Sequence, residues 1–288
     1  MFEIEPSFPS IVFFSPNGTT RQVASWFAEK LMAANLKPEQ IDLTKRTARE
    51  VREIAAAMMP ARRFFVLGTP VYVGHPPKPV IDFVRSLPVQ QDGSVAILYA
   101  VYGGVTCGSA LKDMAMRLHE KSVSILAAAK LVAKHSLVLD PARDRFADRP
   151  STREEALVGE LVEKARAWFS AADPKNDPGV FPHEKLPPRS LLGKFTSRVA
   201  SARLIPPPKH DASRCISCGK CIEECSARCL TLASGNKISR NKDCVKCFNC
   251  LRVCPNHAWK SVFVAAFPRF HDSSARKKKE SSVTAIFK

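Results

Sequence analysis

The chain has 288 residues, of which 45% are hydrophobic, so it can build a sizeable core divided between roughly two domains. Its formal net charge of +17 is uneven, because residues 1–173 hold 22 Lys and Arg against 19 Asp and Glu, whereas residues 174–288 hold 22 against 8. No apolar run is long enough to cross a bilayer, and the acidic start of the chain lacks a secretory signal, so we expect a cytoplasmic protein.

The first 172 residues alternate short apolar runs with longer amphipathic ones. Short apolar runs predict strands, and apolar residues three or four apart predict helices. The alternation predicts an α/β doubly wound fold around a five-stranded parallel sheet. The expected strands are 11–14, 41–43, 62–68, 95–101 and 123–132, and the expected helices are 20–34, 79–87, 107–119 and 151–172, the last opened by a capping box.

Three loops follow the central strands at their carboxyl ends, where doubly wound sheets bind ligands. The first, Ser15 to Thr20, offers hydroxyls, Gly18 and the free amides of a helix start, which together suit an anion. The loops 68–74 and 101–104 each contribute an aromatic residue and glycines. The alternatives are a capped turn for the first loop and ordinary core packing for Tyr72 and Tyr102.

These loops resemble those of flavodoxins, whose phosphate loop reads S-x-T-G-x-T, and the match covers about residues 9–140. The resemblance implies a flavodoxin-like sheet order 2-1-3-4-5 and bound FMN. The third loop departs from the pattern at 105–107, and Cys107 there is either a small buried residue or a thiolate favoured by a helix start. The implied phosphate ligands are Ser15, Asn17, Gly18, Thr19 and Thr20, and the implied ring neighbours are Thr69, Pro70, Val71, Tyr72, Val73, Gly74, Tyr102, Gly103 and Gly104.

A proline-rich stretch separates the two halves of the chain. Its prolines break regular structure, so they predict a linker over 174–210 between an FMN-binding domain at 1–173 and a cysteine-rich domain at 211–268. The remaining residues, 269–288, are expected to form a basic polar tail that contains Arg276 to Lys279.

Nine of the ten cysteines lie between residues 215 and 254, a density that indicates metal in a reducing compartment. They form two runs with the spacing C-x2-C-x2-C-x3-C, in which three thiolates bind one [4Fe–4S] cubane and the fourth binds the other. Zinc is the alternative, but a tetrahedral ion would leave half of these cysteines idle. The predicted ligand sets are Cys215, Cys218, Cys221 and Cys254 for cluster 1, and Cys225, Cys244, Cys247 and Cys250 for cluster 2.

From Arg214 to Trp259 the chain resembles bacterial two-cluster ferredoxins, which are small α+β domains. It keeps their proline after the last ligand at Pro255 but has Ser226 in the first repeat. Superposing the repeats puts Cys229 opposite Ala258, so Cys229 is either a small buried residue or a spare ligand. Both halves and their order are similar to flavodoxin–ferredoxin fusion proteins, the EFR1-like family.

FMN and two [4Fe–4S] clusters on one chain predict an electron-transfer protein that relays low-potential electrons to a protein redox partner. The alternatives are a flavin-dependent oxidoreductase acting on a small substrate or a partner-bound corrinoid, and a basic metal-binding protein for nucleic acid. No nucleic acid is expected, because aromatic residues are not interleaved with the basic ones. The positive second half predicts an acidic docking surface on the partner, with weak contact of the tail to an anionic membrane as a further option.

Overall fold

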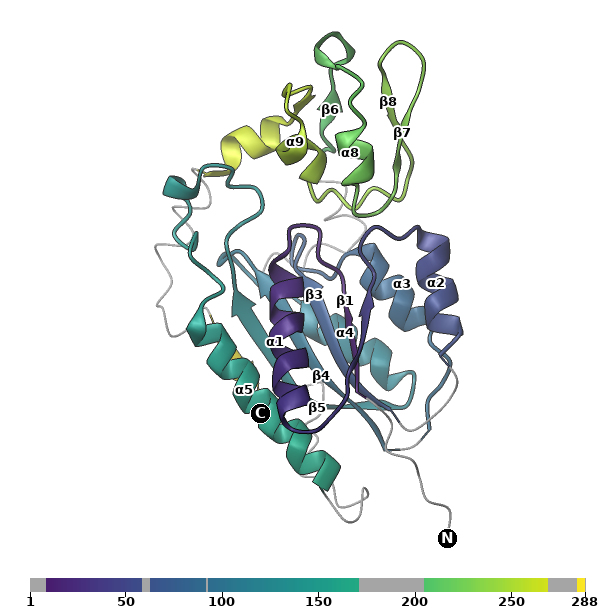
Figure 1. Cartoon of the computed structure of the whole chain (residues 1–288), viewed down its shortest axis with the longest axis vertical. Coiled ribbons are helices and arrows are strands. Elements are labelled where there is room, and N and C mark those ends of the chain that lie inside the picture. The colour runs from purple at the N-terminus through teal and green to yellow at the C-terminus, as the bar shows by residue number, and fades with distance from the viewer. Residues whose placement is uncertain (1–8, 59–62, 92, 171–204, 269–283, 288) are drawn as a thin grey trace.

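The structure is a computed structural model that describes residues 9–58, 63–91, 93–170, 205–268 and 284–287. Most of the predicted linker therefore lies outside the described residues. An α/β body forms one part, and the cysteine-rich half sits at one end of its sheet (Figure 1).

The centre of the body is a sheet whose five parallel strands follow the order 2-1-3-4-5, which confirms the predicted fold class. Strands β3 and β4 are buried along their whole length, as expected for parallel strands covered on both faces. Strand β2 lies at the edge and is largely exposed. The five strands are β1 (Ser10–Phe13), β2 (Glu39–Asp42), β3 (Phe64–Pro70), β4 (Ser94–Tyr102) and β5 (Val123–Val132).

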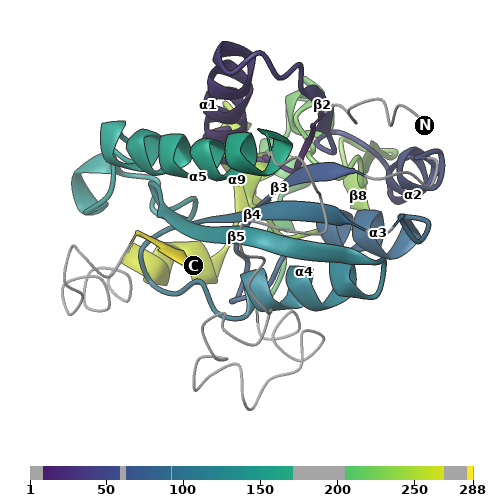
Figure 2. The same ribbon diagram turned by 90° about the horizontal axis from the view of Figure 1, so that it is seen from below.

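Helices cover both faces of the sheet, with α1 (Thr19–Ala33) and α5 (Thr152–Ser170) on one face and α3 (Lys78–Ser86) and α4 (Ala110–His119) on the other (Figure 2). Helix α1 buries Val23, Phe27 and Leu31 at helical spacing, as the sequence predicts. No helix in the described part of the chain is long and apolar enough to span a membrane.

Helix α2 (Ala48–Ala56) is absent from the sequence prediction. It buries Val51 and Ala55 and packs Ile54 against the core, at helical spacing, although it has only nine residues. The sequence also indicates where this helix begins, because Thr47 and Glu50 form a complete capping box.

The stretch that the sequence assigns to a polar tail contributes a sixth strand, β10 (Ala285–Phe287), which pairs antiparallel with β5. Just before it, the Thr284 hydroxyl accepts a hydrogen bond from the Val132 amide at 3.2 Å and donates one to the Glu154 carboxylate at 2.8 Å. Glu154 is fully buried and also pairs with Arg149. The end of the described chain is thus fixed to the body by a buried polar network.

The cysteine-rich half is built from short elements, namely α8 (Lys220–Glu223), α9 (Asn249–Val253) and two small antiparallel sheets. Residues 262–268 are also helical, and Val264 and Phe267 pack there with Leu137 and Val138 of the body. The small sheets pair β6 (Lys209–His210) with β9 (Trp259–Lys260), and β7 (Leu230–Leu232) with β8 (Ile238–Arg240).

Replacing Thr284 with Val should lower the free energy of unfolding by about 1–3 kcal/mol, because it leaves the buried Val132 amide without its acceptor and removes one of the hydrogen bonds to Glu154 Oε1, which keeps its contact with Arg149. Urea denaturation followed by circular dichroism measures the change. Thr231→Val, at an exposed position of β7, is the matched control and should have little effect. Equal losses in both variants would contradict a stabilising role for Thr284.

Candidate functional site

The loop between β1 and α1 has the form of an anion-binding helix start. Gly18, the residue just before the helix, adopts a left-handed φ of 86° and has no side chain to cap it. Ser15 shapes the turn, since its hydroxyl accepts a hydrogen bond from the Arg21 amide at 2.9 Å and its own amide donates to Thr44 at 2.8 Å. The first turn of α1 has no acidic residue, so its amides and the Thr19 and Thr20 hydroxyls face no fixed negative charge there.

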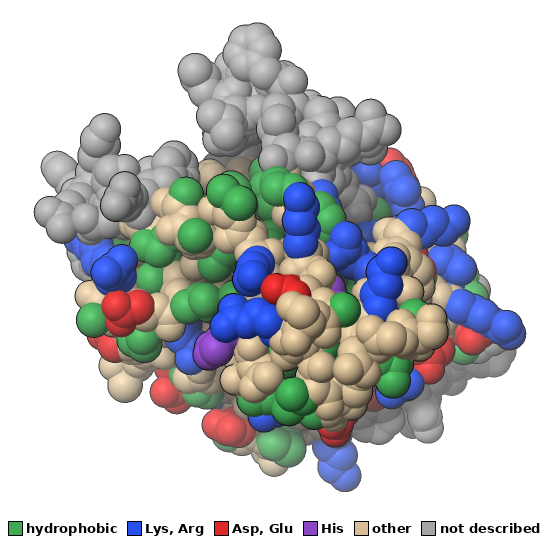
Figure 3. Space-filling view, turned by 90° about the horizontal axis from the view of Figure 1, so that it is seen from above, with side chains coloured by type: hydrophobic (Ala, Val, Ile, Leu, Met, Phe, Trp, Pro, Cys, Tyr) green, Lys and Arg blue, Asp and Glu red, His purple; other side chains and the backbone are tan. Residues whose placement is uncertain are grey.

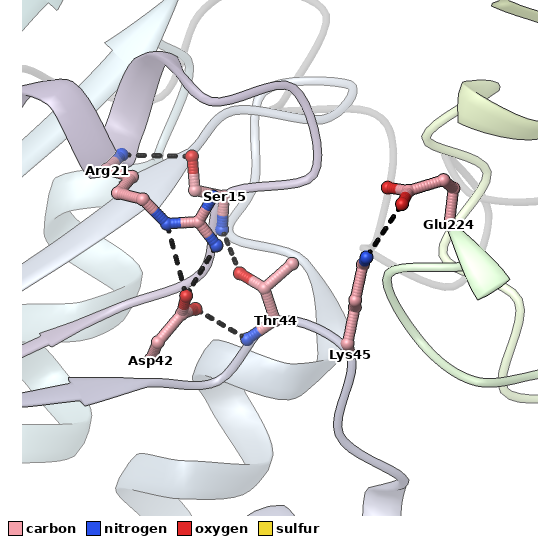
Figure 4. A network of polar contacts seen from close by, with 6 residues as sticks. All are labelled: Ser15, Arg21, Asp42, Thr44, Lys45 and Glu224. Atoms are coloured by element: carbon pink, nitrogen blue, oxygen red, sulfur yellow. Dashed lines mark hydrogen bonds and ion pairs between the residues drawn. The ribbon is translucent and has the colours of Figure 1, made fainter. Parts of the chain in front are cut away.

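Two basic side chains near this loop already have carboxylate partners (Figure 4). Arg21 donates from Nε and Nη2 to Asp42 Oδ2, at 3.2 and 2.5 Å, and Asp42 also accepts from the Thr44 amide. Lys45 reaches across to the cysteine-rich half, where its Nζ lies 2.9 Å from Glu224 Oε1. These contacts fix the loop and join the two halves of the protein at its edge.

The loop after β3 forms a tight turn in which Tyr72 and His75 exchange backbone hydrogen bonds at 2.9 and 3.0 Å. Val73 and Gly74 at its tip both have positive φ, and Val73 is exposed. The Tyr72 hydroxyl is buried and has no hydrogen-bond partner among the described residues. A buried hydroxyl without a partner is costly, so this atom is available to a ligand. The Thr69 side chain is not presented at the sheet edge, because it is fully buried and its hydroxyl donates to the Pro70 carbonyl.

The loop after β4 is covered by another part of the body rather than open. Tyr102 is only 4% exposed, and burial raises the pKa of its hydroxyl. A side chain at Gly103 would collide with His135, and one at Gly104 with Phe146. Cys107 is buried in the same region. Of the two predicted ring loops, only the first therefore presents groups at the sheet edge.

A buried polar cluster holds these two loops together. Ser109 Oγ donates to Asp113 Oδ2 at 2.9 Å, and His75 Nδ1 lies 2.7 Å from the same oxygen. Burial by itself would raise the pKa of Asp113, but these hydrogen bonds outweigh it and hold that pKa below its ordinary value of 3.8. Gly74 and Gly108 approach so closely that a Cβ on Gly108 would lie 2.3 Å from the Gly74 backbone.

In the cysteine-rich half, each predicted ligand set lines a hollow of its own. The first hollow is bounded by all four cysteines of the first set, with Ile216, Ile238 and Trp259 as apolar neighbours. The second hollow is bounded by all four cysteines of the second set and by Cys229. Each hollow thus combines three cysteines of one run with the last cysteine of the other. Among the described residues, no three Cys, His, Asp or Glu side chains are close enough to share a single metal ion.

The two runs also repeat the same backbone shape around their hollows. Left-handed residues recur at equivalent places, with Ser217 matched by Lys246 and Gly219 matched by Phe248. The left-handed conformation recurs although Gly219 is the only glycine among these four residues.

Cys229 occupies the place that the superposed repeats predict. Its amide donates to Cys225 Sγ at 3.3 Å, just as the Ala258 amide donates to Cys254 Sγ at 3.3 Å. Its thiol lies 3.5 Å from Cys225 Sγ, and hydrogen bonding from this thiol is the main cause that lowers the pKa of both Cys225 and Cys244. Cys229 therefore favours the thiolate form of two predicted ligands.

The second hollow is the one that faces the sheet edge of the body. The Lys45 amide donates to the Ser226 carbonyl at 2.8 Å, and the Ser226 hydroxyl lies 3.3 Å from Cys247 Sγ. Cys247 and Arg252 are both close enough to Tyr72 to influence the pKa of its hydroxyl, which burial raises. Arg252 Nη1 also donates to Asn17 Oδ1 at 2.6 Å. Neither Lys45 nor Arg252 is marked by sequence spacing, because both act across more than 175 residues of chain.

No protein-family profile and no curated protein match this sequence. Among solved structures, the chain is similar to a flavodoxin from the domain Archaea, with 14% identity over 57% of this chain and 99% of the other and a TM-score of 0.39. It is also similar to an apo NADH:FMN oxidoreductase, with 15% identity over 60% of this chain and 94% of the other and a TM-score of 0.44. A third similar structure is two-electron reduced Megasphaera elsdenii flavodoxin, with 16% identity over 54% of this chain and 99% of the other and a TM-score of 0.38. Because these identities and scores are low, the fold assignment rests on the strand order itself.

Asp113→Asn should destabilise the protein by about 1–3 kcal/mol at pH 7, because it removes the negative charge of the carboxylate that His75 and Ser109 share and replaces one of its oxygens by an NH2 group. Since the folded state lowers the Asp113 pKa, the wild-type advantage is complete above pH 3.8 and is lost as the pH falls through the folded-state pKa. Urea denaturation across this pH range measures the difference in unfolding free energy between wild type and Asp113→Asn, and Asp148→Asn, at an exposed position, is the control. A difference that does not change with pH would contradict the carboxylate's role.

Proposed function

We propose that this protein is an electron carrier of the flavodoxin–ferredoxin fusion type, which passes electrons between FMN, two [4Fe–4S] clusters and a protein partner. FMN exchanges one or two electrons, whereas each cluster exchanges one, so the chain would convert between the two modes. The observation that supports this most is the gathering of eight cysteines into two hollows beside a flavodoxin-like sheet edge.

FMN fits the groups at this edge. Its phosphate would lie against the start of α1, where Gly18 has no capping side chain and the Thr19 and Thr20 hydroxyls suit an anion. Its ring would lie beside the 71–75 turn, where the Tyr72 hydroxyl lacks a partner. The covered third loop departs from the family pattern, so the ring would have one open face, toward the cysteine-rich half.

The cysteine hollows suit cubanes rather than single ions. A cubane binds each thiolate through a different iron, so its four ligands stand farther apart than the ligands of one zinc ion. Apolar neighbours such as Ile238 and Trp259 would keep water from the first cluster.

The contacts between the halves support an order for the proposed electron transfer, from the flavin through cluster 2 to cluster 1. Cluster 2 would lie next to the flavin, because its ligand Cys247 is beside Tyr72 and Ser226. Cluster 1 would lie on the far side, where Cys218 is exposed and Ile216 is 60% exposed. The partner would therefore meet the protein at cluster 1.

The surface at that end is basic, and we propose an acidic partner for it. Viewed from above, Lys and Arg side chains spread over this face with few acidic ones between them (Figure 3). Three of the four acidic residues of the cysteine-rich half have basic partners, which are Lys45, Lys78 and Lys260. The exposed basic residues here are Lys209, Arg214, Lys220, Arg228, Lys237, Arg240, Lys242, Arg252 and Lys260.

The purified protein should contain one FMN and about eight irons and eight sulfides per chain. Cys254→Ser should remove cluster 1 and abolish transfer to an external acceptor, while flavin-to-cluster transfer within the chain continues. Cys225→Ser, the matched change at the equivalent place of the other repeat, should stop transfer inside the chain. Stopped-flow spectroscopy follows both steps. Zinc without sulfide would refute the clusters, and the same kinetic defect in both variants would refute the order.

Electron transfer to an acidic acceptor protein should slow as salt increases, because exposed charges are screened beyond about 8–10 Å. The tail charges are tested by changing Arg276, Lys277, Lys278 and Lys279 to Gln, since deleting the tail would also remove β10. A rate that does not depend on salt would contradict the acidic partner. Salt dependence that disappears with the tail charges alone would place docking at the tail, and binding to anionic vesicles would then identify a membrane.

A further inference from the structure

Arg252 belongs to the cysteine-rich half, yet it lies at the loop that would hold the FMN phosphate. We propose that Arg252 binds this phosphate, so that the flavin site is completed by the second half of the chain and selects phosphorylated flavin. The proposal rests on the proposed function, because it requires FMN at this loop.

The position of Arg252 is held from two directions. Just before its helix, α9, Phe248 is 3% exposed and packs in a cluster with Leu137 and Val138 of the body. Asn249 at the start of α9 donates to the Glu224 carbonyl at 2.9 Å, and Glu224 itself pairs with Lys45 of the body. The guanidinium therefore reaches Asn17 from a helix that is anchored to the same edge of the sheet.

Charge balance around the loop singles out Arg252. Arg21 is committed to Asp42, and Lys45 to Glu224, as Figure 4 shows. Within the described ranges, Arg252 has no carboxylate partner, and its one side-chain hydrogen bond goes to the neutral Asn17. It is thus the basic group at this loop whose charge is left for a ligand.

The chemistry of the two side chains fits a phosphate. A guanidinium has five N–H donors, of which Asn17 takes one, and its planar shape suits two phosphate oxygens. Because Asn17 Oδ1 accepts this bond, the amide nitrogen of Asn17 remains a donor for a ligand. An FMN phosphate carries about −1.5 to −2 charges at neutral pH, and the start of α1 by itself offers only partial positive charge against it.

This arrangement couples flavin binding to the position of the cysteine-rich half. A phosphate that contacts both the loop and Arg252 favours the state in which the halves are docked, since it binds that state more tightly. Riboflavin lacks the phosphate and should not discriminate between docked and undocked states.

The test compares FMN with riboflavin on the full chain with its clusters loaded and its flavin removed. Arg252→Gln should reduce the preference for FMN about three- to tenfold, which is the range for a charge-assisted contact at an exposed site. Arg252→Lys should keep part of the preference. Arg214→Gln removes the same charge from another exposed position of this half and should keep all of it. Fluorescence titration gives both dissociation constants, and iron content with circular dichroism checks that each variant is folded.

The outcomes separate the two proposals. If wild type binds FMN and Arg252→Gln keeps the wild-type preference, the role of Arg252 is refuted while the proposed function stands. Equal weakening of FMN and riboflavin would also refute it, because the residue would then act only on the fold. If the wild-type chain binds neither flavin, the flavin site fails and Arg252 with it. A preference that declines with salt in wild type but not in Arg252→Gln would support the ionic contact.

Discussion

The hydrogen bond from the Lys45 amide to the Ser226 carbonyl fixes the two halves of the protein at one point, and much of the chemistry depends on it. Lys45 has a left-handed backbone, which turns its amide and its side chain toward the cysteine-rich half. Ser226 in turn contacts Cys247, so this one pair of residues connects the strand-end loops of the sheet to the second hollow. The proposed electron path and the proposed phosphate site both require that proximity.

The parallel direction of the five main strands explains why several loops lie together at the sheet edge that faces the cysteine-rich half. Parallel strands all end at the same edge, so the β1 and β3 loops come together although 50 residues of chain separate them. The cysteine-rich half covers this edge from outside. The resulting site is bounded by backbone turns on one side and by Arg252 and Cys247 on the other.

Sequence patterns anticipated what is local or periodic. Buried strands such as β3 and β4 appear as continuous apolar runs, and the spacing of the cysteines gave the two groups that line the hollows. Contacts between distant segments left no such pattern. Strand β10 has only three residues, and Thr284 just before it bonds to Glu154, a carboxylate 130 residues away. Likewise, His135 and Phe146 cover the loop after β4, and no periodicity indicates that contact.

Strand β10 also bears on how the chain is made. Without it, β5 would be an edge strand, and open edges pair readily with other chains. Because β10 follows the cysteine-rich half in the sequence, β5 stays uncovered during synthesis until that half has left the ribosome. The body of the sheet is therefore most prone to aggregate in the interval before β10 has been made.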